Sequence, residues 1–343
     1  MASASQAPLL LVPYMWIGDF VRCHTVISVA QMRWPGRPID VLSSSLCAPL
    51  VDYMPGVRRA IVSDLPHGRL ALREQWRLSQ GLKAEGYEAA LVVPRKWKAA
   101  LAPFLAGIPK RVGMVGEARF GLINDLRWNE KALPRMVDRC ATLALPRDTA
   151  FPKTWPPPRL CVGTKETADW RRQYGISDIR AVALCPGAAG AQKRWPPEAY
   201  ANLARQLKAA NVDLWIVGGP DERAAAEQIS DNGRIARDLT GGDLRAAIRA
   251  LATATVAVAN DSGLLHVAAA LGTPTIGLYG MTAPAVWAPL NPLAAVIEAP
   301  WSVPCPKCGR SHCTDVRHRR TSDISVDKVF AAVVNALAAG NDS

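Results

Sequence analysis

Short apolar runs alternate along the chain with stretches in which apolar residues recur every three or four positions. The runs "LLLVP" (9–13), "IDVLSS" (39–44) and "AALVVP" (89–94) have the length and composition of buried strands. Between the second and third runs, "WRLSQGLKAEG" (76–86) has the apolar spacing of a helix. This alternation predicts a parallel sheet covered by helices.

The second half of the chain repeats the pattern. Strands are predicted at "AVALCPG" (181–187), "VDLWIVGG" (212–219), "TVAVAN" (255–260) and "TPTIGLYG" (273–280). Helix faces are predicted from Tyr200, Leu203, Ala204 and Leu207, from Leu244, Ile248 and Leu251, and over 326–340, where Gly340 ends an amphipathic segment.

A proline-rich connector separates the two halves. The segment "FPKTWPPPRL" (151–160) contains three consecutive prolines, which continue neither a helix nor a central strand. We therefore expect one α/β domain over 1–155, a second over 156–325, and a C-terminal helix and tail over 326–343. A cleft is expected between the two domains.

Polar residues interrupt one apolar stretch of the second half, "VAVANDSGLLHVAAALGTPTIGLYG" (256–280). Asp261, Ser262 and Gly263 follow a predicted strand and precede a helix expected over 264–271, with His266 one turn further on. Ligands bind beyond the carboxyl ends of parallel strands, and a helix start attracts phosphate. The alternatives are that Asp261 or Ser262 only caps the helix, and that His266 is packed against the sheet.

Two further strand ends carry polar groups. In "CPGAAGAQKRWP" (185–196) a turn with Gly187 precedes Lys193 and Arg194, which are expected to open the next helix and suit a diphosphate. In "VGGPDE" (217–222) Glu222, next to Asp221, can accept hydrogen bonds from ribose hydroxyls. The alternatives are a solvated helix start and an ordinary acidic first turn.

Together these three strand ends predict a nucleotide site. Neither G-x-G-x-x-G nor G-x-x-x-x-G-K-[ST] occurs, which argues against a standard dinucleotide fold or a P-loop.

The charge and composition of the chain indicate which class of partner it binds. The net charge is +12 and the isoelectric point is about 9.6, which favours an acidic partner such as phosphate. The early sequence lacks the pattern of a signal peptide, and glycines and prolines interrupt the uncharged stretch 262–297. We expect a soluble, cytoplasmic protein with reduced cysteines. Nucleic-acid binding is not expected, because the basic "RKWK" (95–98) stands alone and aromatic residues are few.

Four possible zinc ligands lie in "CPKCGRSHC" (305–313): Cys305, Cys308, His312 and Cys313. His312 and Cys313 are adjacent, which is awkward around one tetrahedral ion. Reduced thiols in a loop are therefore favoured, and a structural zinc site is the alternative.

Several uncommon motifs resemble the ADP-heptose:lipopolysaccharide heptosyltransferases. They are "CPG…KRWP", "NDSGLLHVAAALGTPTIGLYG", "WIGD", "WPGRPIDVLSSSLCAPLVDYMPGV", "KAALAPFLAGIPKRVG" and "FGLINDLRW", in the family's order over about residues 9–290. The resemblance implies a GT-B fold, in which two Rossmann-like domains with parallel sheets face each other across a cleft. The acceptor binds the N-terminal domain and the donor binds the C-terminal domain.

The resemblance also implies the reaction: inverting transfer of heptose from ADP-L-glycero-D-manno-heptose to the first heptose of the lipopolysaccharide inner core of a Gram-negative cell. By resemblance, Asp19 is the general base, Lys193 binds the diphosphate, Glu222 contacts the ribose, and Asp261, Gly263 and His266 belong to the donor loop. From its position alone, Asp19 is the N-cap of a helix that starts there. The turn before Lys193 is one residue shorter than usual in the family.

The sequence indicates the acceptor-binding residues less clearly than the donor-binding residues. Lys98, Arg119, Arg135 and Arg139 are candidates for acidic groups of the acceptor, with solvated charges as the alternative. No cofactor is required, a divalent cation can assist, and peripheral contact with the inner face of the inner membrane is expected. Alternative functions are transfer to another acceptor, such as Kdo of the core or a protein hydroxyl, and non-catalytic binding of a nucleotide sugar.

Overall fold

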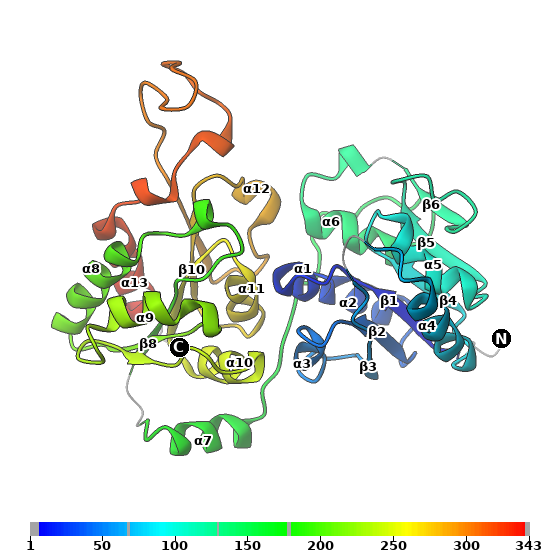
Figure 1. Ribbon diagram of the computed structural model, residues 1–343, viewed down its shortest axis with the longest axis horizontal. Helices are drawn as coiled ribbons and strands as arrows, with labels where there is room; N and C mark the ends of the chain where they lie inside the picture. The colour runs from blue at the N-terminus through cyan, green and yellow to red at the C-terminus, as the bar shows by residue number, and fades with distance from the viewer. Residues whose placement is uncertain (1–6, 67–68, 129, 177–179, 340–343) are drawn as a thin grey trace. The chain divides into compact units, whose positions relative to one another are not determined.

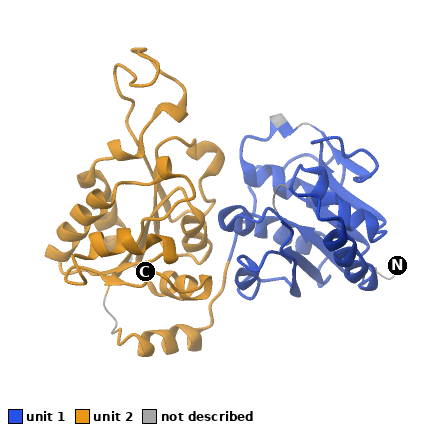
Figure 2. Cartoon of the chain, in the orientation of Figure 1, with its two compact units in different colours: residues 1–159 blue, residues 160–343 orange. Residues whose placement is uncertain are grey.

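The computed structural model describes residues 7–66, 69–128, 130–176 and 180–339, which belong to two compact units (Figure 2). Unit 1 comprises residues 1–159 and unit 2 residues 160–343, so the division falls four residues after the position inferred from the prolines. Among the described residues, no helix is long and apolar enough to cross a membrane.

Unit 1 contains a six-stranded parallel sheet in the order β3-β2-β1-β4-β5-β6. The central strand β1 is buried along its whole length, as its continuous apolar run requires in a sheet covered on both faces. Its strands are β1 Leu9–Val12, β2 Ile39–Ser43, β3 Arg59–Val62, β4 Ala89–Val92, β5 Lys110–Met114 and β6 Asp125–Arg127.

Helices cover both faces of this sheet. Leu10, Val12 and Val92 pack on one face against α4 and α5, and α1, α2 and α6 belong to the other layer (Figure 1). The helices are α1 Ile17–Arg22, α2 His24–Arg33, α3 Ala48–Val51, α4 Leu72–Ala84, α5 Trp97–Leu105 and α6 Met136–Ala141, with 3₁₀ turns η1 Glu130–Ala132 and η2 Thr142–Ala144.

Unit 2 repeats the topology with a second six-stranded parallel sheet, in the order β12-β11-β10-β7-β8-β9. Its strands are β7 Ala181–Cys185, β8 Asp213–Ile216, β9 Arg237–Asp238, β10 Val256–Asn260, β11 Thr275–Tyr279 and β12 Ala294–Glu298. The expected class, two Rossmann-like parallel sheets wrapped by helices, is confirmed.

One face of this sheet carries a hydrophobic core, in which Leu184, Ile216 and Val258 pack against α8, α9 and α13. The C-terminal helix α13 is thus part of unit 2, and Gly340, its expected end, lies outside the described residues. The helices are α7 Thr164–Gln173, α8 Pro197–Ala209, α9 Arg223–Ser230, α10 Leu244–Thr253, α11 Gly263–Ala270, α12 Pro284–Trp287 and α13 Val326–Ala339, with 3₁₀ turns η3 Ala191–Lys193, η4 Pro220–Glu222, η5 Val316–His318 and η6 Thr321–Asp323.

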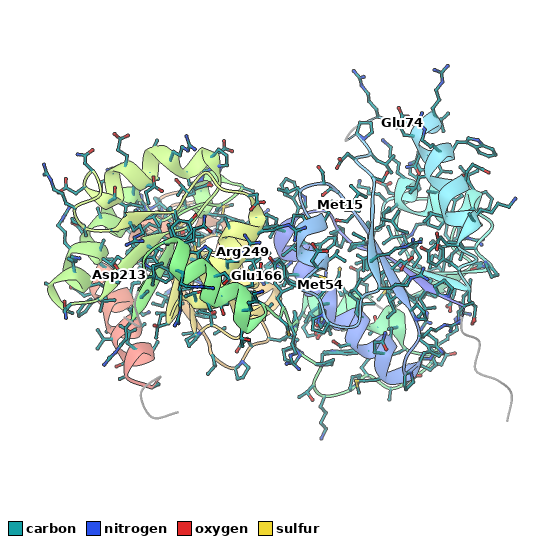
Figure 3. The ribbon with its side chains drawn as sticks, turned by 90° about the horizontal axis from the view of Figure 1, so that it is seen from below. Met15, Met54, Glu74, Glu166, Asp213 and Arg249 are labelled. Carbon is teal, nitrogen blue, oxygen red and sulfur yellow. The ribbon has the colours of Figure 1, made fainter. Side chains whose placement is uncertain are left out.

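The opposite face is covered by α7, α10 and α11. Figure 3 shows Glu166 on α7 next to Arg249 on α10, and an ion pair of 2.5 Å between Arg249 Nε and Glu166 Oε1 joins these two helices. Both side chains of the pair are one-third exposed, so we expect the pair to orient α7 but to add little to the free energy of unfolding.

Each sheet has one position where the strand order reverses. This switch point lies between β1 and β4 in unit 1 and between β7 and β10 in unit 2. The connections after the two strands leave in opposite directions there, so the strand ends open a crevice in which ligands of such sheets bind. In unit 2 the polar ends of β7 and β10 fall at the switch point, and the end with Glu222 follows the neighbouring strand β8.

Candidate functional site

The switch point of unit 2 brings together two segments that are far apart in the sequence. The turn after β7 supplies Lys193 and the strand end of β10 supplies Asp261, and Lys193 Nζ lies 2.7 Å from Asp261 Oδ2. The Asp261 side chain is 6% exposed, whereas that of Lys193 is 32% exposed. An ammonium group has three N–H donors, so Asp261 can fix the head of Lys193 while other donors face an incoming anion.

The buried side chain of Asn260 fixes the backbone around this pair. Its Oδ1 accepts a 2.9 Å hydrogen bond from the Trp195 N–H, and its Nδ2 donates to the Pro186 carbonyl at 2.7 Å. Asn260 thereby ties the last residue of β10 to both ends of the turn that carries Lys193. Asn260 was not among the predicted site residues, although a polar amide at the end of an apolar run was the available signal.

Lys193 and Arg194 were expected to open the next helix, and the structure corrects this. Lys193 ends the 3₁₀ turn η3, and α8 begins only at Pro197. Arg194 instead donates from Nε to the Ala188 carbonyl at 2.9 Å. The two prolines at 196 and 197 explain the delay, because the residue before a proline disfavours helical backbone.

Glu222 lies against the glycine turns after β7 and β8. Its Oε2 accepts a 2.9 Å hydrogen bond from the Gly219 N–H, and a Cβ at Gly187 would lie 2.7 Å from Oε1. Gly187 therefore provides the space that the carboxylate occupies. Burial, and secondarily the charge of Glu222, raises the pKa of the neighbouring Cys185 thiol to about 12.

Helix α11 begins at Gly263, two residues after Asp261. Ser262 occupies the N-cap position, but its hydroxyl makes no capping hydrogen bond to the described first turn. The Asp261 carboxylate accepts a hydrogen bond from Lys193. The structure therefore does not support the alternative in which Asp261 or Ser262 only caps the helix. His266 is 3% exposed on α11 and therefore lies within packed protein.

In unit 1 the switch point carries Asp19. The helix starts at Ile17 with Trp16 as N-cap, so Asp19 is the third helical residue and the N-cap interpretation is wrong. Asp19 forms an ion pair with Arg22 one turn later, and its side chain is 23% exposed. Burial, followed by the charges of Cys140, Cys23 and Asp19, raises the pKa of the nearby Tyr14 hydroxyl to about 12.

The basic residues predicted to meet the acceptor each contact a carbonyl or carboxylate group of unit 1. Arg119 is 1% exposed and donates to the Pro94 carbonyl at 2.6 Å and to the Met114 carbonyl, which favours support of the strand ends over ligand contact. Lys98 Nζ donates to the Arg69 carbonyl at 2.6 Å. Arg135 pairs with Asp138 at 3.0 Å, and Arg139 Nε donates to the Leu133 carbonyl at 3.0 Å.

The cysteine loop differs from its expected ligand set. Among the described residues, Cys305, Cys308, Cys313 and His318 form one group, whereas His312 is exposed and does not belong to it. Adjacent side chains in a non-helical loop point in different directions, so His312 does not join Cys313, and a histidine five residues further on does.

The unit 2 site combines three features that suit a nucleotide with a diphosphate. Lys193 supplies a positive charge, α11 offers the N–H groups of its first turn, and Glu222 offers a carboxylate beside a glycine turn. All three are held by strands of the same sheet.

Comparison with known proteins shows the family of this chain. Residues 75–315 match the model of glycosyltransferase family 9 (heptosyltransferase). Lipopolysaccharide heptosyltransferase 2 of Escherichia coli is 37% identical, with 84% of this chain and 87% of that protein covered. Lipooligosaccharide heptosyltransferase 2 of Haemophilus influenzae is 34% identical, with 84% and 88% covered.

The solved structure of E. coli ADP-heptose lps heptosyltransferase II superposes with a TM-score of 0.83 at 31% identity, covering 97% of this chain and 99% of that one. The similarity therefore extends over both units. The chain belongs to glycosyltransferase family 9, the heptosyltransferases.

Proposed function

We propose that this protein transfers heptose from ADP-L-glycero-D-manno-heptose to the first heptose of the lipopolysaccharide inner core. The observation that carries the proposal is the Lys193–Asp261 pair at the switch point of unit 2, followed directly by the start of α11. It is supported by the similarity to heptosyltransferase 2 proteins, whose names state their activity on lipopolysaccharide.

In this proposal unit 2 binds the donor. The diphosphate lies against Lys193 and the first turn of α11, at Gly263, and the ribose hydroxyls donate to Glu222. When the bond between the sugar and the diphosphate breaks, negative charge grows on the departing phosphate. Fixed positive groups that face this charge lower the barrier without having to reorganise.

Unit 1 supplies the acceptor side and the base. Asp19 accepts the proton of the attacking acceptor hydroxyl, while that oxygen bonds to the anomeric carbon and ADP departs from the opposite face. A single displacement of this kind inverts the anomeric centre. The carboxylate is suited to the role because it is partly exposed beside Arg22, which can hold it in one orientation.

The reaction as written needs no cofactor, because Lys193 and helix dipoles stabilise the leaving group. A divalent cation that bridges the diphosphate would add to that stabilisation. Assays with and without added Mg²⁺ measure its contribution, and a transfer rate that depends on Mg²⁺ by orders of magnitude would contradict a purely protein-based mechanism.

We further propose peripheral contact with an anionic membrane through α4. Leu72, Trp76 and Gln80 lie one turn apart beside Arg73 and Arg77, and all five line one exposed surface. Exposed tryptophan next to arginine is typical of surfaces that lie at a lipid interface.

Sedimentation with vesicles tests this contact. The double variant Arg73→Gln, Arg77→Gln should bind phosphatidylglycerol vesicles at least about tenfold more weakly, since each basic residue at an anionic surface contributes about 1 kcal/mol. The matched pair Arg171→Gln, Arg172→Gln on α7 should bind as the unmodified protein does. Equal loss in both pairs would indicate a general charge effect and refute an α4 contact.

The transfer reaction itself is tested with purified inner core that bears either one heptose or none. Product only with the one-heptose acceptor is the expected result. Product only with the bare core would move the acceptor to Kdo, and a donor that binds without any transfer to either acceptor would leave only nucleotide-sugar binding.

A further inference from the structure

The loop between β12 and α13 projects from the rest of unit 2 as the orange segment of Figure 1. From residue 299 to residue 315 it contains neither helix nor strand, and most of its side chains are exposed. A segment of this length without a core of its own needs another constraint to hold one conformation. Its cysteines play no part in the proposed transfer.

Four side chains of this loop converge on one point. One potential ligand atom from each of Cys305, Cys308, Cys313 and His318 lies within 4.8 Å of the other three. The spacing is C-x₂-C-x₄-C-x₄-H, in which the first two ligands belong to one turn and the others follow at regular intervals. Three cysteines and one histidine form a standard set for structural zinc.

The turn "CPKCGR" aims its two sulfurs to the same side. Cys305 N–H donates to the Arg310 carbonyl at 2.9 Å, and Gly309 N–H donates to the Cys305 carbonyl at 2.8 Å. Gly309 has φ +68°, a left-handed conformation that glycine adopts without strain.

The distances around His318 fit a tetrahedral ion. Its Nδ1 lies 3.6 Å from the Cys305 sulfur and 3.5 Å from the Cys313 sulfur. With Zn–S of about 2.3 Å and Zn–N of about 2.0–2.1 Å, the sulfur–nitrogen edge of a tetrahedron is about 3.6 Å. These two sulfur–nitrogen pairs thus stand at nearly the separation that zinc imposes.

Groups around the four ligands complete the arrangement. The other ring nitrogen of His318 faces Asp315, with Nε2 3.8 Å from Oδ2, and a carboxylate on this side is the usual partner of a metal-bound histidine. Three thiolates and one Zn²⁺ leave a net charge of −1, and Lys307 compensates it from within the loop, where its Nζ donates to the Arg317 carbonyl at 2.9 Å.

We propose that Cys305, Cys308, Cys313 and His318 bind one structural Zn²⁺ that holds this loop in place. Each cysteine loses its thiol proton to solvent on binding, and His318 coordinates through Nδ1. Zinc is favoured over other divalent ions because thiolates are soft ligands and a set of three sulfurs and one nitrogen suits a tetrahedral ion. The proposal is independent of the transferred sugar and of the acceptor.

The loop returns to the nucleotide site directly after the ligands. Thr321 Oγ1 donates to the Gln192 carbonyl at 3.1 Å, next to Lys193, and Arg319 Nε donates to the Ala299 carbonyl at 2.6 Å. Zinc therefore fixes a segment whose end supports the turn of Lys193.

Metal analysis of the purified full-length protein tests the proposal. The protein is produced in zinc-supplemented medium and purified under reducing conditions. Elemental analysis by mass spectrometry should then find about one zinc per chain. The variants Cys308→Ser and His318→Ala should lose most of it. Their matched controls, Cys161→Ser and His312→Ala, alter an exposed cysteine and an exposed histidine outside the cluster and should retain it.

Cobalt substitution keeps the test decisive if a ligand variant fails to fold. Co²⁺ in the unmodified protein should give the intense visible bands of a tetrahedral ion and a thiolate charge-transfer band, both absent after addition of equimolar Zn²⁺. Retention of zinc in His318→Ala with loss in His312→Ala would overturn the ligand set. Iron in place of zinc, or no bound metal in protein whose three cysteines are reduced, would overturn the proposal.

Discussion

The two switch points carry the same kind of ion pair but build it differently. In unit 1 Asp19 pairs with Arg22, three residues away on the same short helix, whereas in unit 2 Asp261 pairs with Lys193, 68 residues away on another strand end. A local pair needs only helical backbone, but a non-local pair forms only once β7 and β10 lie side by side. The unit 2 site therefore depends on the fold in a way that the unit 1 site does not.

The pairs also leave different partners accessible. Asp19 keeps its carboxylate 23% exposed and shields its arginine, whereas Asp261 is nearly buried and presents its lysine. The difference matches the proposed division of labour, in which unit 1 offers a base to a hydroxyl and unit 2 offers a cation to a diphosphate. Four predictions test this contrast.

The largest effect is expected for Asp19→Asn, which preserves shape and removes the base. Turnover should fall by about 10²–10⁴, the usual contribution of general base catalysis, while the Kd of ADP changes less than about twofold. Asp169→Asn breaks another acid–arginine pair of the same spacing, Asp169 with Arg172 on α7, and should leave turnover unchanged. Full activity of Asp19→Asn would show that Asp19 is not the general base.

Next in size is Asn260→Ala, which breaks the ties between the strand ends of unit 2. It leaves the Trp195 N–H and the Pro186 carbonyl buried without that partner, so the free energy of unfolding should fall by about 2–4 kcal/mol in urea titrations. Asn124 in unit 1 makes the same two kinds of hydrogen bond, to Arg111 and Pro109, but is exposed. Asn124→Ala should cost less than about 1 kcal/mol, and equal costs would show that burial is not the deciding factor.

A smaller effect is expected for Lys193→Gln. Loss of a charged hydrogen-bond donor should weaken ADP binding by about 1.5–3 kcal/mol, or about tenfold to a hundredfold, measured by calorimetry. Lys208→Gln makes the same change on the exposed side of α8 and should not alter the Kd. Unchanged affinity in Lys193→Gln would mean that this pair supports structure only.

The smallest effect is expected for Gly187→Ala. The new methyl would lie 2.7 Å from Glu222 Oε1, so the flexible carboxylate must shift, and ADP should bind a few-fold more weakly without a change in fold. Gly190→Ala in the same turn meets its nearest neighbour at 3.4 Å, with ordinary extended backbone, and should bind ADP normally. An equal loss in both variants would indicate that the turn, and not Glu222, is affected.

Buried strands were predictable because their runs are apolar on both faces. The predictions for β1, β2, β4, β7, β8, β10 and β11 are confirmed, and Leu244, Ile248 and Leu251 lie on α10 as predicted. The edge strands β3, β6 and β12 were missed, and each is only partly buried. The inner strand β5 was missed as well, because it begins with the charged residues Lys110 and Arg111. The short β9 was missed because both of its residues are exposed.

A charged residue inside a buried strand shows the same limit. Asp40 in β2 is fully buried, and Arg58 and Tyr87 hydrogen-bond to it at 2.5–2.7 Å. Burial alone would raise the pKa of this carboxyl, but the hydrogen bonds of Arg58 and Tyr87 hold it below its usual value. Period-two and helical patterns contain no information about such partners, because they lie far apart in the chain.

The sequence by itself determined the strand and helix pattern, the two-fold repetition of an α/β unit, and the polar strand ends where a ligand would bind. These are local properties, since burial and helix starts are specified by neighbouring residues. Only the tertiary structure decided that Asp261 holds Lys193, that Asn260 ties Pro186 to Trp195, and that His318 replaces His312 beside the cysteines. Each of these contacts depends on how separate turns and strands converge, which no spacing along the chain specifies.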